Sequence, residues 1–133
     1  MFGWKALGVD TVVSLLEASE QNELDLDREG DIARRYNLNF ISFPIPDRDV
    51  PSTFADSTAL LEGLKSQLQS GKSVTIHCRQ GVGRAGTIAA SVLASMNIDP
   101  ELAIRIVSGA RGVPVPETPE QHQWISAAVA QRA

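Results

Sequence analysis

The segment VTIHCRQGVGRAGTIAASVLASM, residues 74–96, constrains the fold of this chain more than any other part. A β-branched run leads into a glycine-rich loop, and an apolar stretch with helical composition follows. A strand, loop and helix in this order form a recurrent anion site, because successive backbone N–H groups point inward and the helix N-terminus adds partial positive charge. Gly81 and Gly83 permit the close approach of backbone to anion. The only cysteine, Cys78, opens this loop, and Arg84 ends it.

The remaining segments alternate between strand-like and helix-like patterns. Short apolar runs predict strands at 11–17, 40–45 and 73–78, and periodic or capped segments predict helices at 25–37, 53–71, 84–96, 99–112 and 120–132. Strands separated by helices predict an α/β fold, with a central, mostly parallel sheet of about four strands flanked by helices. Since no repeat or linker divides the 133 residues, we expect a single domain spanning 1–133.

Composition narrows the classes of function. A net charge of −4 and a pI near 5.1 argue against a nucleic-acid binder or a protein of anionic membrane surfaces. Cys78, His77 and His122 are too few for a Cys/His zinc cluster, so we expect neither a metal nor another cofactor. No apolar run reaches membrane-spanning length and no secretory signal opens the chain, so the expected location is the cytoplasm. The oligomeric state stays open.

The loop residues suit phosphate chemistry. Positive potential at a helix N-terminus and beside an arginine favours the thiolate, which is the nucleophilic form of cysteine. The planar fork of Arg84 can bind two non-bridging phosphate oxygens. The stretch lacks the GK[ST] of a nucleotide-binding P-loop. The sequence therefore predicts Cys78 as a nucleophile in a phosphate-binding loop made by Arg79, Gln80, Gly81, Val82, Gly83 and Arg84.

HCRQGVGR resembles the HCxxGxxR signature of the cysteine-dependent protein tyrosine and dual-specificity phosphatase superfamily. Its glycine pattern is similar to that of the small dual-specificity branch, which includes the kinase-associated phosphatase type. The resemblance implies hydrolysis of a phosphorylated protein or small phosphate ester through a phosphocysteine intermediate. It covers most of the chain, but the family's usual N-terminal strand has no counterpart, so we expect either a minimal core or a truncated domain.

The leaving oxygen of a phosphate ester needs a proton, which a carboxylic acid opposite the thiolate can donate. FPIPDRDVPS supplies two candidates, Asp47 and Asp49, which lie 31 and 29 residues before Cys78. The resemblance implies an acid on a loop in this region. We favour Asp47, because PIPD at the end of a strand is closer to the family pattern, and Asp49 remains the alternative.

Three further positions bear on the reaction. Ala85 stands where the family usually has Ser or Thr to assist departure of the thiolate, which predicts slow hydrolysis of the phosphoenzyme. The resemblance implies a water-positioning role for Glu117, with Gln121 as second choice. Thr118 and Gln121 also form a capping-box pattern at the start of the last helix. Arg79 is a candidate for recognising a second phosphate or an acidic flank of the substrate.

Other functions remain as alternatives. Ala85 motivates a phosphate- or phosphoprotein-binding module of low turnover, against which the intact Cys78 and Arg84 argue. A sulfurtransferase also places one cysteine between strand and helix, but the HCxxGxxR pattern and the upstream aspartates disfavour it. An arsenate reductase is disfavoured because the chain has no second cysteine.

Overall fold

The structure is a computed structural model, and it describes residues 8–26, 28–51, 54–79 and 82–132. Along the chain it contains β1 (Thr11–Ser14), α2 (Ala18–Glu23), α3 (Glu29–Arg35), β2 (Asn39–Ser42), α4 (Phe54–Gln69), β3 (Val74–His77), α5 (Gly83–Ala94), α6 (Pro100–Arg111) and α7 (Pro119–Arg132). Within the described residues, none of the helices has both the length and the apolar character needed to cross a membrane.

The three strands form one parallel sheet in the order β2-β1-β3. Val12 of the central strand lies opposite Phe40 of β2 and Thr75 of β3. The predicted α/β fold is thereby confirmed, with three strands among the described residues where about four were expected. Each apolar run that the sequence marked as a strand does enter the sheet, although β1 ends at Ser14 rather than at residue 17.

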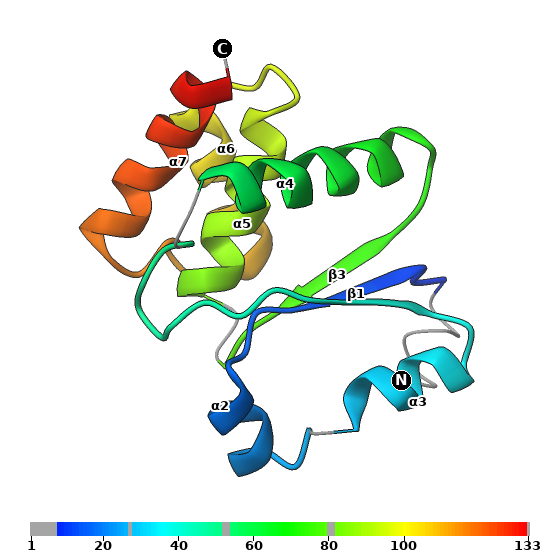
Figure 1. Cartoon of the computed structure of the whole chain (residues 1–133). Coiled ribbons are helices and arrows are strands. Elements are labelled where there is room, and N and C mark those ends of the chain that lie inside the picture. Colours follow the sequence, from blue (N-terminus) through cyan, green and yellow to red (C-terminus); the bar gives the residue numbers. More distant parts are fainter. Residues whose placement is uncertain (1–7, 27, 52–53, 80–81, 133) are drawn as a thin grey trace.

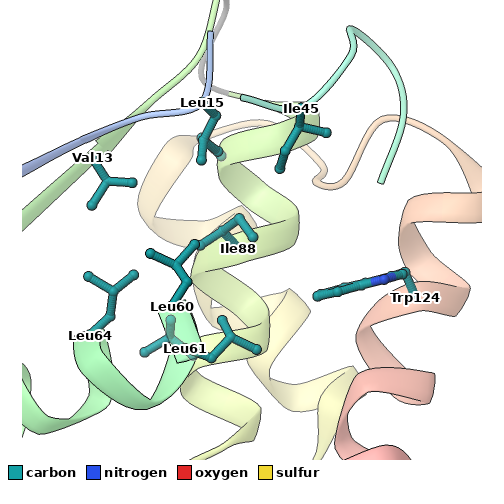
Figure 2. Packing of buried hydrophobic residues seen from close by; sticks show 10 residues of the cluster. Val13, Leu15, Ile45, Leu60, Leu61, Leu64, Ile88 and Trp124 are labelled. Carbon is teal, nitrogen blue, oxygen red and sulfur yellow. The ribbon is translucent and has the colours of Figure 1, made fainter. Parts of the chain in front are cut away.

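Helices cover both faces of this sheet (Figure 1). Successive side chains of a strand point to opposite faces, so Val12 packs under α3 with Ala33 and Leu38. Val13 instead faces the larger core, where α4, α5 and α7 supply buried side chains around Ile88 (Figure 2). α6 packs against the far side of α5, so α5 is enclosed by its neighbours.

Local signals set the ends of α6 as predicted. The Asp99 carboxylate accepts hydrogen bonds from the N–H groups of Glu101 and Leu102, and Pro100 occupies the first helical position. Gly112 ends the helix with a φ of 78°, a left-handed conformation that glycine adopts without strain.

The helix α2 has no counterpart among the predicted elements. It is six residues long and polar, so it offers no apolar periodicity. A capping box opens it: the backbone N–H of Glu17 donates to Glu20 Oε1 at 3.1 Å, and the Glu17 side chain accepts from the backbone of Glu20. This short helix carries a carboxylate that proves central to the site.

Candidate active site

A cavity of about 190 Å³ lies where β3 leads into the cysteine loop, residues 78–84. It is lined by Asp47, Arg48, Cys78, Arg79, Gly83, Arg84 and Glu117. The structure thus brings together the predicted nucleophile, acid, arginine and water-positioning glutamate. Arg48 was not predicted. Of the remaining predicted loop residues, Val82 is described but does not line the cavity, and Gln80 and Gly81 lie outside the described residues.

Cys78 follows directly on β3 and is half-buried. α5 begins five residues later at Gly83, so its N-terminus faces the same loop. A Cβ at Gly83 would lie 2.8 Å from Oε1 of Glu117, closer than real side chains approach. Glycine at this position therefore lets the helix N-terminus and the Glu117 segment meet at the cavity.

The guanidinium of Arg84 is almost fully buried and is held from two sides. Its Nη1 and Nη2 donate to Oε1 and Oε2 of Glu20 at 2.6 and 2.8 Å, and Nη1 also donates to the carbonyl of Ile45 at 2.9 Å. These bonds use three of the five N–H groups of an arginine. The other two, on Nε and Nη2, share one edge of the guanidinium and match the spacing of two phosphate oxygens.

Glu20 and Arg84 stabilise each other's charged forms. The hydrogen bonds from Arg84 lower the pKa of Glu20, against the opposing effect of burial. Hydrogen bonding to Glu20 likewise raises the pKa of Arg84, and electrostatic interactions with the nearby Cys78 and Asp47 raise it further. The arginine is therefore charged and oriented before any ligand arrives.

Glu20, like Arg48, is a residue of the candidate site that the sequence did not predict. It lies 64 positions before Arg84, and nothing in the local pattern links the two residues. Glu17 and Glu20 form a capping box in the folded chain, but Glu is not one of the residues that usually begin such a box, so the spacing alone does not mark it. A local sequence pattern therefore predicts neither α2 nor its contact with the arginine.

The two candidate acids occupy different positions on the acid loop, residues 46–50. Asp47 lines the cavity, and its Oδ1 lies 3.5 Å from Nη2 of Arg84. Asp49 is exposed and is not among the cavity residues; its Oδ1 accepts a hydrogen bond from the N–H of Val50 at 2.8 Å. The backbone N–H of Asp49 closes a turn onto the carbonyl of Pro46 at 3.0 Å. The geometry therefore favours Asp47.

Gln121 ties the acid loop to the Glu117 segment. Its side chain is fully buried, and its Nε2 donates to the carbonyl of Asp49 at 3.1 Å. Its Oε1 accepts from the N–H groups of Glu117 and Thr118 at 3.0 and 3.1 Å. The hydroxyl of Thr118 accepts from the N–H of Gln121, so the predicted capping box is present. Gln121 is thus a positioning residue, while Glu117 lines the cavity.

Thr87 does not take the place of the Ser or Thr that the sequence lacks directly after Arg84. Ala85 is buried and belongs to the main core. The hydroxyl of Thr87 donates its one hydrogen to the carbonyl of Gly83 at 2.8 Å, within the first turn of α5. That hydrogen is therefore already engaged and is not available to a departing thiolate.

The strand end before the cysteine is also anchored. His77 Nε2 lies 2.8 Å from Oε2 of Glu29, whose side chain is buried where α3 begins. This contact joins the end of β3 to the helix on the other face of the sheet. In the described part of the chain, no three His, Cys, Asp or Glu side chains are grouped so that they could hold a metal ion.

Comparison with known proteins places the fold and the loop in one class, the dual-specificity phosphatases. The family described as "Polymorphic toxin system, DSP-PTPase phosphatase" matches residues 4–97, and the chain belongs to it. The match includes the cysteine loop and the acid loop, and it ends before α6.

Individual relatives agree with this assignment. Cyclin-dependent kinase inhibitor 3 of Sus scrofa is 26% identical over 123 residues, which cover 91% of this chain and 58% of that protein. The solved structure of Tk-PTP in the active form is 28% identical, with a TM-score of 0.76, and the match covers 97% of this chain and 83% of that one.

A crystal structure of kinase associated phosphatase (KAP), with its catalytic cysteine replaced by serine, has a TM-score of 0.84. The match covers 96% of this chain and 72% of the other chain. Since the two chains are only 21% identical, the match supports the fold alone. The chain spans little more than half the length of cyclin-dependent kinase inhibitor 3, so that protein's activity and substrates are not transferred to it directly.

Proposed function

We propose that this chain is a cysteine-dependent phosphatase that hydrolyses phosphomonoesters on phosphorylated proteins. One observation carries the proposal: a single cavity is lined by Cys78, Asp47 and Arg84, and Glu20 holds the arginine in place. These are the groups that phosphoryl transfer to a thiol requires, namely a nucleophile, an acid and an oriented cation.

In the first step the Cys78 thiolate attacks phosphorus in line with the leaving oxygen. The S–P bond forms, the P–O ester bond breaks, and Asp47 donates a proton to the departing alcohol or phenol. The Nε and Nη2 edge of Arg84 and the backbone N–H groups of the loop, residues 79–84, bind the equatorial oxygens and stabilise their charge.

In the second step water attacks the phosphocysteine. Glu117 positions this water molecule, and the ionised Asp47 accepts a proton from it. The S–P bond then breaks and releases phosphate and the Cys78 thiolate. Since neither residue 85 nor Thr87 offers a hydroxyl hydrogen to the leaving sulfur, this step is expected to limit turnover. No metal or organic cofactor enters either step, and a cytoplasmic location remains a prediction.

A stopped-flow record of nitrophenol release from p-nitrophenyl phosphate tests both steps. We expect a stoichiometric burst followed by slower release, and no release by the folded Cys78→Ser variant. Asp47→Asn should lower kcat about 10²- to 10⁴-fold with substrates that have poor leaving groups, and Asp49→Asn should lower it far less. A folded chain with neither burst nor turnover would leave only the binding module of low turnover.

A further inference from the structure

The backbone of Arg48 adopts a conformation that arginine rarely takes. Its φ is 63°, in the left-handed region. The other described non-glycine residues with positive φ are Asp25, Asn37 and Asn97, whose short polar side chains tolerate this region. Arg48 has no such compensation, yet its side chain lines the cavity next to the proposed acid. The turn that the Asp49 N–H closes onto the carbonyl of Pro46 places Arg48 at its third position, where a positive φ is usual, so it is the place of the side chain at the cavity that points to a function.

A second arginine lines the same cavity from the cysteine loop. Arg79 pairs with Glu23 of α2 at 3.1 Å and lies 3.9 Å from Glu20. Arg48 pairs with Glu117 at 3.5 Å. We call Arg48 and Arg79 the rim arginines. With Arg84 they place three guanidinium groups around one cavity, on a chain whose net charge is −4.

The partners of the rim arginines are exchangeable. The side chains of Arg48 and Glu23 are each 62% exposed, so water screens both ion pairs. A phosphate dianion bound at Arg84 repels Glu117 and Glu23 and attracts the arginines. An anionic group on the substrate can therefore replace either carboxylate, and a guanidinium binds phosphate or carboxylate oxygens through two N–H groups at once.

We propose that the rim arginines select phosphorylated polypeptide segments that carry a second anionic group, a carboxylate or another phosphate, beside the phosphate to be removed. This inference rests on the proposed function and names the substrate class for the same cavity. Arg48 binds the second anionic group from the acid loop, and Arg79 binds it from the cysteine loop. The two arginines lie on either side of Cys78 along the sequence, and both line its cavity.

The test uses two phosphotyrosine peptides that differ only in having Asp or Asn on each side of the phosphorylated residue. We would measure kcat/KM by phosphate release with the unmodified chain, and Kd by calorimetry with the Cys78→Ser variant. We expect the acidic peptide to be preferred about tenfold in both measurements, and the preference to shrink as salt is added.

Variants then assign the preference to residues. Arg48→Ala and Arg79→Ala should each reduce the ratio between the acidic and the neutral peptide severalfold. Glu23→Gln, which removes the competing partner of Arg79, should increase the ratio. Arg34→Ala is the control, because Arg34 is about as exposed as Arg48, pairs with Asp31 and does not line the cavity. The control lowers net charge by one unit, as the test variants do, and should leave the ratio unchanged.

Two results would overturn the proposal. One is equal kcat/KM and equal Kd for the two peptides. The other is a preference that Arg34→Ala reduces as much as the rim variants do, which would assign it to net charge. If no peptide is turned over, the proposed function fails while the Kd ratio of the Cys78→Ser variant still decides the inference. If the first result is accompanied by a preference for fructose 1,6-bisphosphate over fructose 6-phosphate, the rim arginines select small phosphate esters instead.

Discussion

Two arginine–carboxylate pairs border the same cavity, and they differ in nearly every physical respect. Arg84 and Glu20 are buried and joined by two hydrogen bonds of 2.6 and 2.8 Å. Arg48 and Glu117 are joined at a single distance of 3.5 Å, and their side chains are 62% and 31% exposed. The first pair joins α2 to α5, whereas the second joins the acid loop to the segment before α7.

The difference teaches what each pair can do. A buried pair loses its hydration and must keep its partner, because either charge left alone in the interior is strongly unfavourable. It therefore serves as a fixed element that orients the guanidinium of Arg84. An exposed pair is worth little and is screened by salt, so its members are free to bind a ligand instead.

The largest expected effect comes from breaking the buried pair. Glu20→Gln leaves the Arg84 guanidinium buried without a counter-charge, and we expect the free energy of unfolding to fall by about 3–5 kcal/mol. Because the arginine also loses its orientation, phosphatase activity should fall in any fraction that stays folded. Urea unfolding followed by circular dichroism measures the first effect, and initial rates measure the second.

Glu23→Gln is the matched control on the same helix. Glu23 is exposed, and its ion pair lies at the surface, so the change in stability should stay within about 0.5 kcal/mol. Equal losses from Glu20→Gln and Glu23→Gln would show that α2 tolerates neither change and that burial is not the cause.

Acid should weaken the buried pair in a defined direction. Arg84 lowers the pKa of Glu20 below its ordinary value of 4.5. The carboxylate of Glu20 therefore takes up a proton more readily in the unfolded chain than in the folded chain. As a result, the pair's contribution to the free energy of unfolding is complete above pH 4.5 and is lost as the pH falls through the pKa of Glu20 in the folded chain. Urea unfolding between pH 7 and pH 3 should show the difference between the unmodified chain and Glu20→Gln narrowing toward low pH. A constant difference would contradict the linkage.

Gln121 is a neutral side chain that anchors the acid loop, as Glu20 anchors Arg84. Replacing Gln121 by Leu keeps the volume but leaves the N–H groups of Glu117 and Thr118 and the carbonyl of Asp49 without this partner. We expect a loss of about 1–3 kcal/mol, together with a lower kcat because the acid loop loses its anchor. Gln123→Leu, at an exposed position on the same helix, controls for the added apolar surface.

The sequence predicted the parts of the molecule that local chemistry determines. The strand ending at His77, the loop around Cys78 and the capped start of α6 follow from residue patterns over a few positions. Spacing brought both Asp47 and Asp49 into consideration. Only the folded loop separates them, because the turn directs one carboxylate to Arg84 and the other to a backbone N–H.

What the sequence did not predict depends on distant contacts. The pairing of Glu20 with Arg84 joins positions 64 residues apart, and it arises only when the fold brings the side chain of α2 within reach of the first turn of α5. Arg48 was overlooked for a different reason: a charged residue in a polar loop is usually solvated. Its positive φ and its place at the cavity become visible only in the folded chain.

The smallest expected effect comes from the exposed pair. A double-mutant cycle with Arg48→Ala and Glu117→Gln should give a coupling free energy between 0 and about 1 kcal/mol, and the coupling should fall further at high salt. Urea unfolding of the four chains measures it. A value near that of a buried pair would mean that Arg48 is held as firmly as Arg84. Such an arginine would not exchange its carboxylate for a substrate anion, because the ligand would have to repay the whole energy of the pair. A small coupling leaves Arg48 available to the ligand, because little free energy is lost when the arginine exchanges its carboxylate for a substrate anion.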